Sequence, residues 1–312
     1  MVGLGAVTFM GWVPSSKFHS SLNTLNSSLN TQPYLCPMRC TVCGHEANEV
    51  VFNARGFQVV VCGTCQFGQV NPLPDVETLT QLYNSQEYFA THMHYDYANI
   101  SQSEVEKQIR LAGQLHGALI GPYLNGSKSL LEIGPGGGFA LKHFQQRGMR
   151  VKGVETSDSS AQFMRERLNI EVENAMLETY PLGEQWDVVM LNHVLEHFLD
   201  VRAAMERLAA LVSKGGLLYV RVPDHDSYDR RRMGNAWPAY LPFHISYFSE
   251  KSLRLLFEEY GFKVQKTSSF ISEQFMRGTP GPVRQLGIRL INFLGLQGRF
   301  AGRTVAIVGR KE

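Results

Sequence analysis

Short apolar runs alternate with amphipathic stretches along the second half of the chain. The runs that predict strands cover residues 130–133, 151–155, 170–175, 186–191, 217–222, 262–267 and 304–308. Apolar positions that repeat every three to four residues predict helices over residues 139–147, 157–168, 201–212, 252–260 and 284–296. Strands and helices in this alternation are typical of a doubly wound α/β sheet, whose ligands bind at the carboxyl ends of the strands.

The first half of the chain has a different composition. Residues 1–37 contain no acid and are rich in Ser and Asn, which favours a disordered extension, or an upstream start before the real one near Met38. An aromatic-rich stretch leads to a helix that begins at a capping box, Ser101 with Glu104, and ends at Gly121-Pro122. We expect four segments: the extension (1–37), a cysteine module (38–74), a helical and aromatic lid (75–126) and the large domain (127–312).

A glycine-rich turn follows the first strand of the large domain and precedes its first helix. Its pattern is Glu132-x-Gly134-x-Gly136-x-Gly138, in which glycines let the backbone turn sharply and approach a ligand. The dinucleotide fingerprint Gly-x-Gly-x-x-Gly does not fit, because Phe139 stands where the third glycine is required. A carboxylate at Glu132 would also repel a pyrophosphate, whereas it suits a ligand that carries an ammonium and a sulfonium.

This turn resembles motif I of the class I S-adenosylmethionine (SAM)-dependent methyltransferases. The resemblance implies a Rossmann-like, doubly wound sheet of seven strands that ends in an antiparallel pair, with Gly134, Gly136 and Gly138 at the cofactor. Glu155 stands 23 positions after Glu132, where an acid can accept both ribose hydroxyls.

Two further strand ends belong to the implied cofactor site. Asn174-Ala175 lies where the family places a polar side chain against the adenine. Asn192 and His193, after the fourth strand, are expected to line the wall near the methyl group.

Four cysteines form two pairs with metal-ligand spacing. Cys40-x2-Cys43 and Cys62-x2-Cys65 are separated by eighteen residues, which is typical of two knuckles that close one structural zinc site. We expect Gly44 and Gly63 to form the turns of the two knuckles, and residues 50–52 and 57–61 to form a hairpin between them. Two disulfides or a redox pair are the alternatives. Cys36 is expected to be a free thiol in the extension.

The resemblance extends over about residues 38–270. The block Trp186–Asn192 with Val194-Leu195-Glu196-His197 resembles the fourth strand of the family and its following turn. The block Pro242-Phe243-His244-Ile245-Ser246 resembles one in bacterial methyltransferases that modify small molecules, sugars and polysaccharide precursors. A zinc ribbon that ends in Asn-Pro-Leu-Pro is similar to the start of sugar methyltransferases from deoxysugar pathways. The sugar C-methyltransferases of that group carry a further large domain, so O- or N-methylation is the expectation here.

A hydroxyl acceptor must lose a proton, and imidazole titrates near neutrality. His244, then His197, then His193 are therefore the candidate bases, although each histidine has a structural role as its alternative. The run Arg230-Arg231-Arg232 is interpreted as a solvated face, with binding of a substrate carboxylate or phosphate as the alternative.

Composition narrows the choice of substrate. The net charge of the 312 residues is +2, which gives no field that would attract nucleic acid or an anionic membrane. No apolar run approaches the roughly 20 residues that cross a bilayer, so we expect a cytoplasmic protein.

The sequence predicts a SAM-dependent methyltransferase with a small-molecule acceptor and a structural zinc ion, and it leaves the oligomeric state open. The alternatives are an RNA methyltransferase and a non-catalytic SAM-binding scaffold. The composition of the ribbon argues against an RNA methyltransferase, since the segment between Cys40 and Cys65 holds one Arg and no Lys for contacts with phosphates.

Overall fold

The computed structural model describes residues 39–45, 50–54, 57–75, 77–78, 97, 99–270 and 304–312. The expected extension over residues 1–37, the thiol Cys36, most of the aromatic stretch and the helix over residues 284–296 lie outside these residues. No helix of the described part of the chain is both long enough and apolar enough to cross a membrane.

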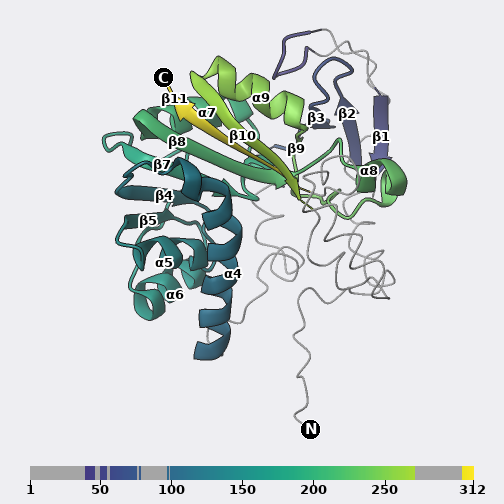
Figure 1. The fold of residues 1–312 in the computed structure, drawn as a ribbon. Coiled ribbons are helices and arrows are strands. Elements are labelled where there is room, and N and C mark those ends of the chain that lie inside the picture. Colours follow the sequence, from purple (N-terminus) through teal and green to yellow (C-terminus); the bar gives the residue numbers. More distant parts are fainter. Residues whose placement is uncertain are drawn as a thin grey trace, which may run out of the picture.

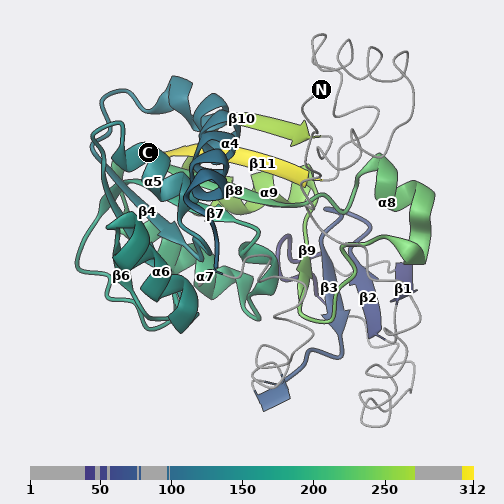
Figure 2. The ribbon, with the colours of Figure 1, turned by 90° about the horizontal axis from the view of Figure 1, so that it is seen from below.

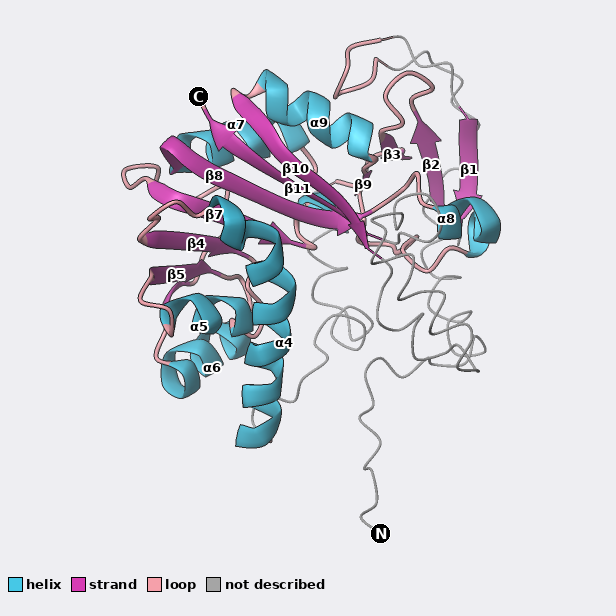
Figure 3. Ribbon diagram, viewed as in Figure 1, coloured by secondary structure: helices cyan, strands magenta, loops and turns pink. Residues whose placement is uncertain are grey.

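The large domain is built on one seven-stranded sheet (Figures 1 and 3). Its order is β10-β11-β8-β7-β4-β5-β6, in which all neighbours are parallel except those of β11. The strands are β4 (Ser129–Ile133), β5 (Arg150–Val154), β6 (Glu171–Glu173), β7 (Trp186–Asn192), β8 (Val212–Pro223), β10 (Phe262–Phe270) and β11 (Thr304–Lys311). The chain winds outward from β4 to β6 and then returns to β7 on the other side of β4. The carboxyl ends of β4 and β7 therefore flank the switch point at which such sheets bind ligands.

Helices cover both faces of the sheet (Figure 1). Buried residues of α4 (Gln102–Ile120), α5 (Phe139–Gln145) and α6 (Asp158–Leu168) share one core cluster with Leu130, Val188 and Leu217. Residues of α7 (Val201–Leu211) and α9 (Glu250–Glu259) share the other with Leu131 and Val189. Adjacent strand residues thus point to opposite faces and both faces are buried, as a sheet of the doubly wound class requires.

Several element ends differ from the sequence prediction. β8 begins at Val212, before Gly215-Gly216, because Val212 already pairs with Trp186 of β7. The capping box predicted at Ser101 is only half present: the Ser101 hydroxyl accepts from the Glu104 N–H, but the Glu104 carboxylate binds Lys107 and Gln108 instead. The complete capping box of the described helices is at Ser249 and starts α9.

The cysteine module contributes three antiparallel strands, β1 (Val50–Ala54), β2 (Phe57–Val61) and β3 (Gly68–Asn71). The first two form the predicted hairpin. The fourth strand of this small sheet is β9 (Ser246–Tyr247), which comes from the large domain and was not predicted (Figure 2). Phe67 also packs on Phe248, with ring centroids 5.4 Å apart. The module is therefore joined to the large domain through backbone pairing and a shared core.

Candidate functional site

The glycine turn lies at the carboxyl end of β4, as predicted. Gly134, Gly136 and Gly138 all have positive φ, of 62°, 55° and 66°. A Cβ on Gly134 would lie 2.6 Å from Val194 and one on Gly138 would lie 2.6 Å from Met164, whereas one on Gly136 would meet no atom of the described part of the chain within 4 Å. Gly136 thus borders open space, and the other two glycines allow the close packing that shapes the turn.

Glu132 is a buried carboxyl that lacks a complete set of partners. Its side chain is 3% exposed, and its Oε2 accepts no hydrogen bond from the described residues. Burial and the nearby Glu155 raise the pKa of Glu132 to about 8. A buried acceptor without a donor is costly, so this position fits a cationic group of a ligand.

Glu155 closes the opposite side of the turn, at the end of β5. Its Oε2 accepts from the Gly136 N–H at 3.0 Å and its Oε1 from the Ser157 N–H at 2.9 Å. Burial raises the pKa of Glu155, and these backbone donors oppose the rise. The carboxylate is held against the glycine turn, where a ribose bound in the turn would lie.

The next two predicted residues lie after β6. Asn174 is exposed, and its Nδ2 donates to Asp158 at 3.0 Å, while Ala175 packs against the core. Both residues follow the carboxyl end of β6, so they lie on the same side of the glycine turn as Glu155.

Asn192 and His193 end β7 on the other side of β4. His193 has a φ of 57°, a conformation that is uncommon outside glycine and that often occurs at functional sites. Its Nδ1 lies 3.1 Å from Oε1 of Glu196, and its side chain is 35% exposed. Burial and the Arg221 guanidinium lower the pKa of His193, and burial raises the pKa of Glu196 to about 7. A carboxyl that orients a histidine is the usual support of a general base.

His197 and His244 are close together, and His244 is buried whereas His197 is half-buried. Their ring centroids are 5.0 Å apart, and one ligand atom of each lies within 4.8 Å of Glu196. His197 Nδ1 donates to the Phe243 carbonyl at 2.9 Å, and His244 Nδ1 donates to the Ala239 carbonyl at 2.8 Å. Burial lowers the pKa of His197. The His197 bond connects the turn after β7 to the loop before β9, and the His244 bond lies within that loop.

Two polar residues of this edge, Glu196 and Arg221, were not predicted as site residues. Glu196 is 1% exposed and stands in the motif block next to His197. Arg221 of β8 donates to Asn192 Oδ1 at 3.0 Å. The sequence signal for each is a single charged residue within a mostly apolar stretch, which no glycine or histidine motif includes.

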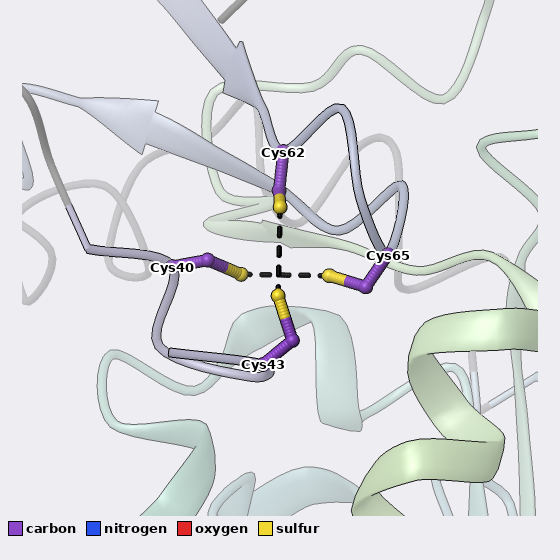
Figure 4. A group of neighbouring side chains, drawn as sticks. All are labelled: Cys40, Cys43, Cys62 and Cys65. Carbon is purple, nitrogen blue, oxygen red and sulfur yellow. Dashed lines mark hydrogen bonds between the residues drawn. The ribbon is translucent and has the colours of Figure 1, made fainter. Parts of the chain in front are cut away.

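The four cysteines converge on one point (Figure 4). Sγ of Cys40 lies 3.5 Å from Sγ of Cys65, and Sγ of Cys43 lies 3.6 Å from Sγ of Cys62. A disulfide needs about 2.05 Å, whereas thiolates around a tetrahedral zinc at about 2.3 Å lie about 3.8 Å apart. The four thiols are unbridged, and the donor set fits a closed zinc site.

The backbone around the cysteines follows the knuckle pattern with one correction. The N–H of Gly44 donates to the Cys40 carbonyl, and the N–H of Gln66 donates to the Cys62 carbonyl. Gly63 lies in the turn of the second knuckle, as predicted, but the positive φ falls on Gly44 (69°) in the first knuckle and on Gln66 (60°) in the second, and Gly63 has none. The turn requires positive φ directly after the second cysteine of each pair, and Gly63 follows the first.

Comparison with known proteins agrees with this arrangement. A family model described as a methyltransferase domain matches residues 104–267, just over half of the chain. The chain belongs to the methyltransferase family. This methyltransferase also has the fold of magnesium protoporphyrin IX methyltransferase from Synechocystis, solved with bound SAH, at a TM-score of 0.51 and 15% identity over 76% of this chain and all of that one.

Curated relatives match shorter stretches of the methyltransferase. A ubiquinone biosynthesis O-methyltransferase of Rhodopseudomonas palustris (strain TIE-1) is 32% identical over 96 residues, 29% of this chain and 38% of the relative. The C-methyltransferase NovU of Streptomyces niveus is 27% identical over 184 residues, 55% of this chain and 41% of NovU. The chain thus spans about two fifths of the length of these relatives. The expectation of a SAM-dependent methyltransferase is confirmed at the level of the family.

Proposed function

We propose that the protein transfers a methyl group from SAM to a hydroxyl or amine of a small molecule, of the sugar or natural-product class. The observation that carries the proposal is the buried, unpartnered Glu132 oxygen beside the glycine turn, with Glu155 on one side and the His193–Glu196 pair on the other. Glu132 and Glu155 lie at the carboxyl ends of β4 and β5. His193 lies at the carboxyl end of β7, on the other side of the switch point.

The residues of the β4, β5 and β6 ends fit the parts of SAM. Glu132 would accept from its ammonium group, Glu155 from its ribose hydroxyls, and Asn174 and Ala175 would lie against the adenine. Gly136 leaves room for the ligand, since no atom of the described residues lies within 4 Å of where its Cβ would be. When bound, SAM supplies an electrophilic methyl group on a sulfonium, and much of the rate then comes from holding the acceptor close and aligned.

We propose His193, oriented by Glu196, as the residue that takes the acceptor's proton. Burial and the Arg221 guanidinium lower its pKa, which keeps the ring neutral at pH 7 but weakens it as a base. The Glu196 carboxyl at Nδ1 would offset this by stabilising a proton on Nε2. His244 is 4% exposed, and the Phe243 carbonyl holds the neighbouring His197. These two histidines fit a positioning role better than the roles of first and second base predicted from the sequence.

The cysteine cluster supports a second proposal, a structural zinc ion. Cys40, Cys43, Cys62 and Cys65 would be its ligands, and a closed four-thiolate site leaves no position for water or substrate. The ion would stabilise the small sheet to which β9 belongs. The similarity of this module to that of deoxysugar methyltransferases is the reason for placing a sugar among the acceptors.

C-methylation is a second candidate function, because the match to the C-methyltransferase NovU covers more of this chain than the match to the O-methyltransferases. RNA methylation has weaker support, since the described ribbon offers few cations for phosphate contacts.

The test is a methyl-transfer assay on a panel of sugars, phenols and amines with labelled SAM, in which NMR of the product identifies the methylated atom. Transfer to oxygen or nitrogen that is lost in His193→Ala supports the proposal. Transfer to carbon would establish the second candidate. If no acceptor of the panel is methylated while SAM still binds, the scaffold alternative takes precedence.

A further inference from the structure

Arg221 is a partly buried guanidinium near the carboxyl end of β8. Its Nη1 donates to Asn192 Oδ1 at 3.0 Å and its Nη2 to Thr304 Oγ1 at 3.4 Å, whereas its buried Nε has no partner. Both partners are neutral, and no described carboxylate lies within ion-pair distance of the guanidinium. The charge of Arg221 is thus not compensated by a direct contact within the described structure.

Such a charge is costly to bury, and burial lowers the pKa of Arg221. A guanidinium has five N–H donors in a planar fork, and two are used here. The remaining donors match the two oxygens of a carboxylate or phosphate, which arginine binds in a bidentate way. The contacts to Asn192 and Thr304 fix the orientation of the fork before any ligand arrives.

The position of Arg221 separates it from the proposed cofactor contacts. It pairs in register with Asn192 of β7, and the backbone N–H of His193 donates to its carbonyl at 2.8 Å. β8 lies two strands from β4, about 10 Å at the usual strand spacing, on the side away from Glu155. The guanidinium therefore lies beside the proposed base and on the acceptor side of the switch point.

We propose that Arg221 binds an anionic group of the methyl acceptor, a carboxylate or a phosphate. The proposal rests on the proposed function, because it places the acceptor at this edge of the sheet. It narrows the acceptor class to acids and phosphorylated compounds, and it makes Arg221 a specificity-determining residue.

The experiment is calorimetric titration of the full-length, SAH-saturated protein with benzoate, inorganic pyrophosphate and neutral benzamide at constant ionic strength. Wild type is compared with Arg221→Gln, Arg221→Lys and the matched control Arg232→Gln, in which an exposed arginine of α8 (Tyr228–Met233) is changed. The SAH affinity and thermal unfolding of each variant are measured first, which separates loss of a ligand contact from loss of fold.

We expect wild type to bind at least one of the two anions and not benzamide, and Arg221→Gln to weaken that binding at least tenfold. Arg221→Lys should keep part of the affinity, and Arg232→Gln and the SAH affinities should be unchanged. Binding of benzoate alone indicates a carboxylate acceptor, and binding of pyrophosphate alone a phosphorylated one.

Three results would overturn the inference: no anion binding by wild type, equal weakening in Arg232→Gln, or unchanged binding in Arg221→Gln. A loss of SAH affinity in Arg221→Gln without anion binding by wild type would assign the guanidinium to the cofactor carboxylate instead. If wild type bound no SAH, the proposed function would fail, while titration of the SAH-free protein would still decide whether Arg221 is an anion site.

Discussion

Replacing Glu155 by alanine should weaken SAM binding strongly and leave the fold intact. Each carboxylate oxygen of Glu155 already accepts one backbone N–H, from Gly136 or from Ser157. A carboxylate has about four lone-pair positions. Oε2 therefore keeps one position for a ribose hydroxyl, whereas Oε1 also accepts from the Thr156 hydroxyl at 3.5 Å, a long bond that a second ribose hydroxyl would replace. The two ribose bonds can therefore form without breaking the bonds that hold the glycine turn.

The size of the effect follows from these two bonds. A hydrogen bond to a charged group contributes about 1.5–3 kcal/mol, so the loss of two costs at least about 3 kcal/mol. Since 1.4 kcal/mol corresponds to a factor of ten, the Kd for SAM should rise about 100-fold or more. Equilibrium titration measures the Kd, and thermal unfolding checks the fold.

Glu171→Ala is the matched control, because Glu171 is an exposed acid of β6 that pairs with Lys152. Its affinity for SAM should equal that of wild type. A change of less than about threefold in Glu155→Ala, or an equal change in both variants, would refute the ribose assignment. Such a result would mean that the ribose of the cofactor does not bind the Glu155 carboxylate.

Three further predictions follow from the site. The pKa of Glu132 is raised to about 8, and binding of an ammonium requires the ionised carboxylate, so the affinity for SAM should rise from pH 6 to pH 8. Titrations with SAM across this pH range should show no such rise in Glu132→Gln. Cys62→Ser should lose zinc by metal analysis and lower turnover while keeping SAM affinity; unchanged turnover in the metal-free variant would argue against coupling through β3 and β9. Glu196→Gln should lower kcat by about 100-fold or more and remove a rise in kcat/KM near pH 7, and wild-type kinetics in this variant would exclude Glu196 as the support of the base.

The sheet and the cofactor edge were predictable because their signals are local. A strand, a glycine turn and a helix are consecutive in the sequence, and the acid of the next strand follows at a fixed spacing. Glu132, Gly136 and Glu155 accordingly lie together at the carboxyl ends of β4 and β5. The four cysteines converge for the same reason, since each pair is a short local motif.

The remaining features depend on contacts between distant residues. The two-residue strand β9 exists only because β3, about 180 residues earlier, pairs with it. The state of Arg221 depends on Thr304 of β11, and the orientation of His197 depends on the Phe243 carbonyl. No periodicity records such contacts, and the predicted order of the three histidines therefore rested on residue type alone.

The described contacts also show how the cysteine module reaches the acceptor side of the site. The Val70 N–H donates to the Ile245 carbonyl at 3.0 Å, and the Ile245 N–H donates to the Glu196 carbonyl at 2.8 Å. Ile245 follows His244 directly, so the small sheet holds both the loop that carries His244 and the turn that carries Glu196. A structural zinc ion in the cysteine module would therefore affect catalysis by holding this loop and this turn in position.

The most direct test of the central claim is calorimetric titration of the metal-loaded protein with SAM, with NAD as the control ligand. We expect a single SAM site with micromolar Kd and no heat from NAD, because Glu132 favours an ammonium and repels a pyrophosphate. Binding of NAD, or no binding of SAM, would show that the glycine turn and Glu132 do not form a SAM site.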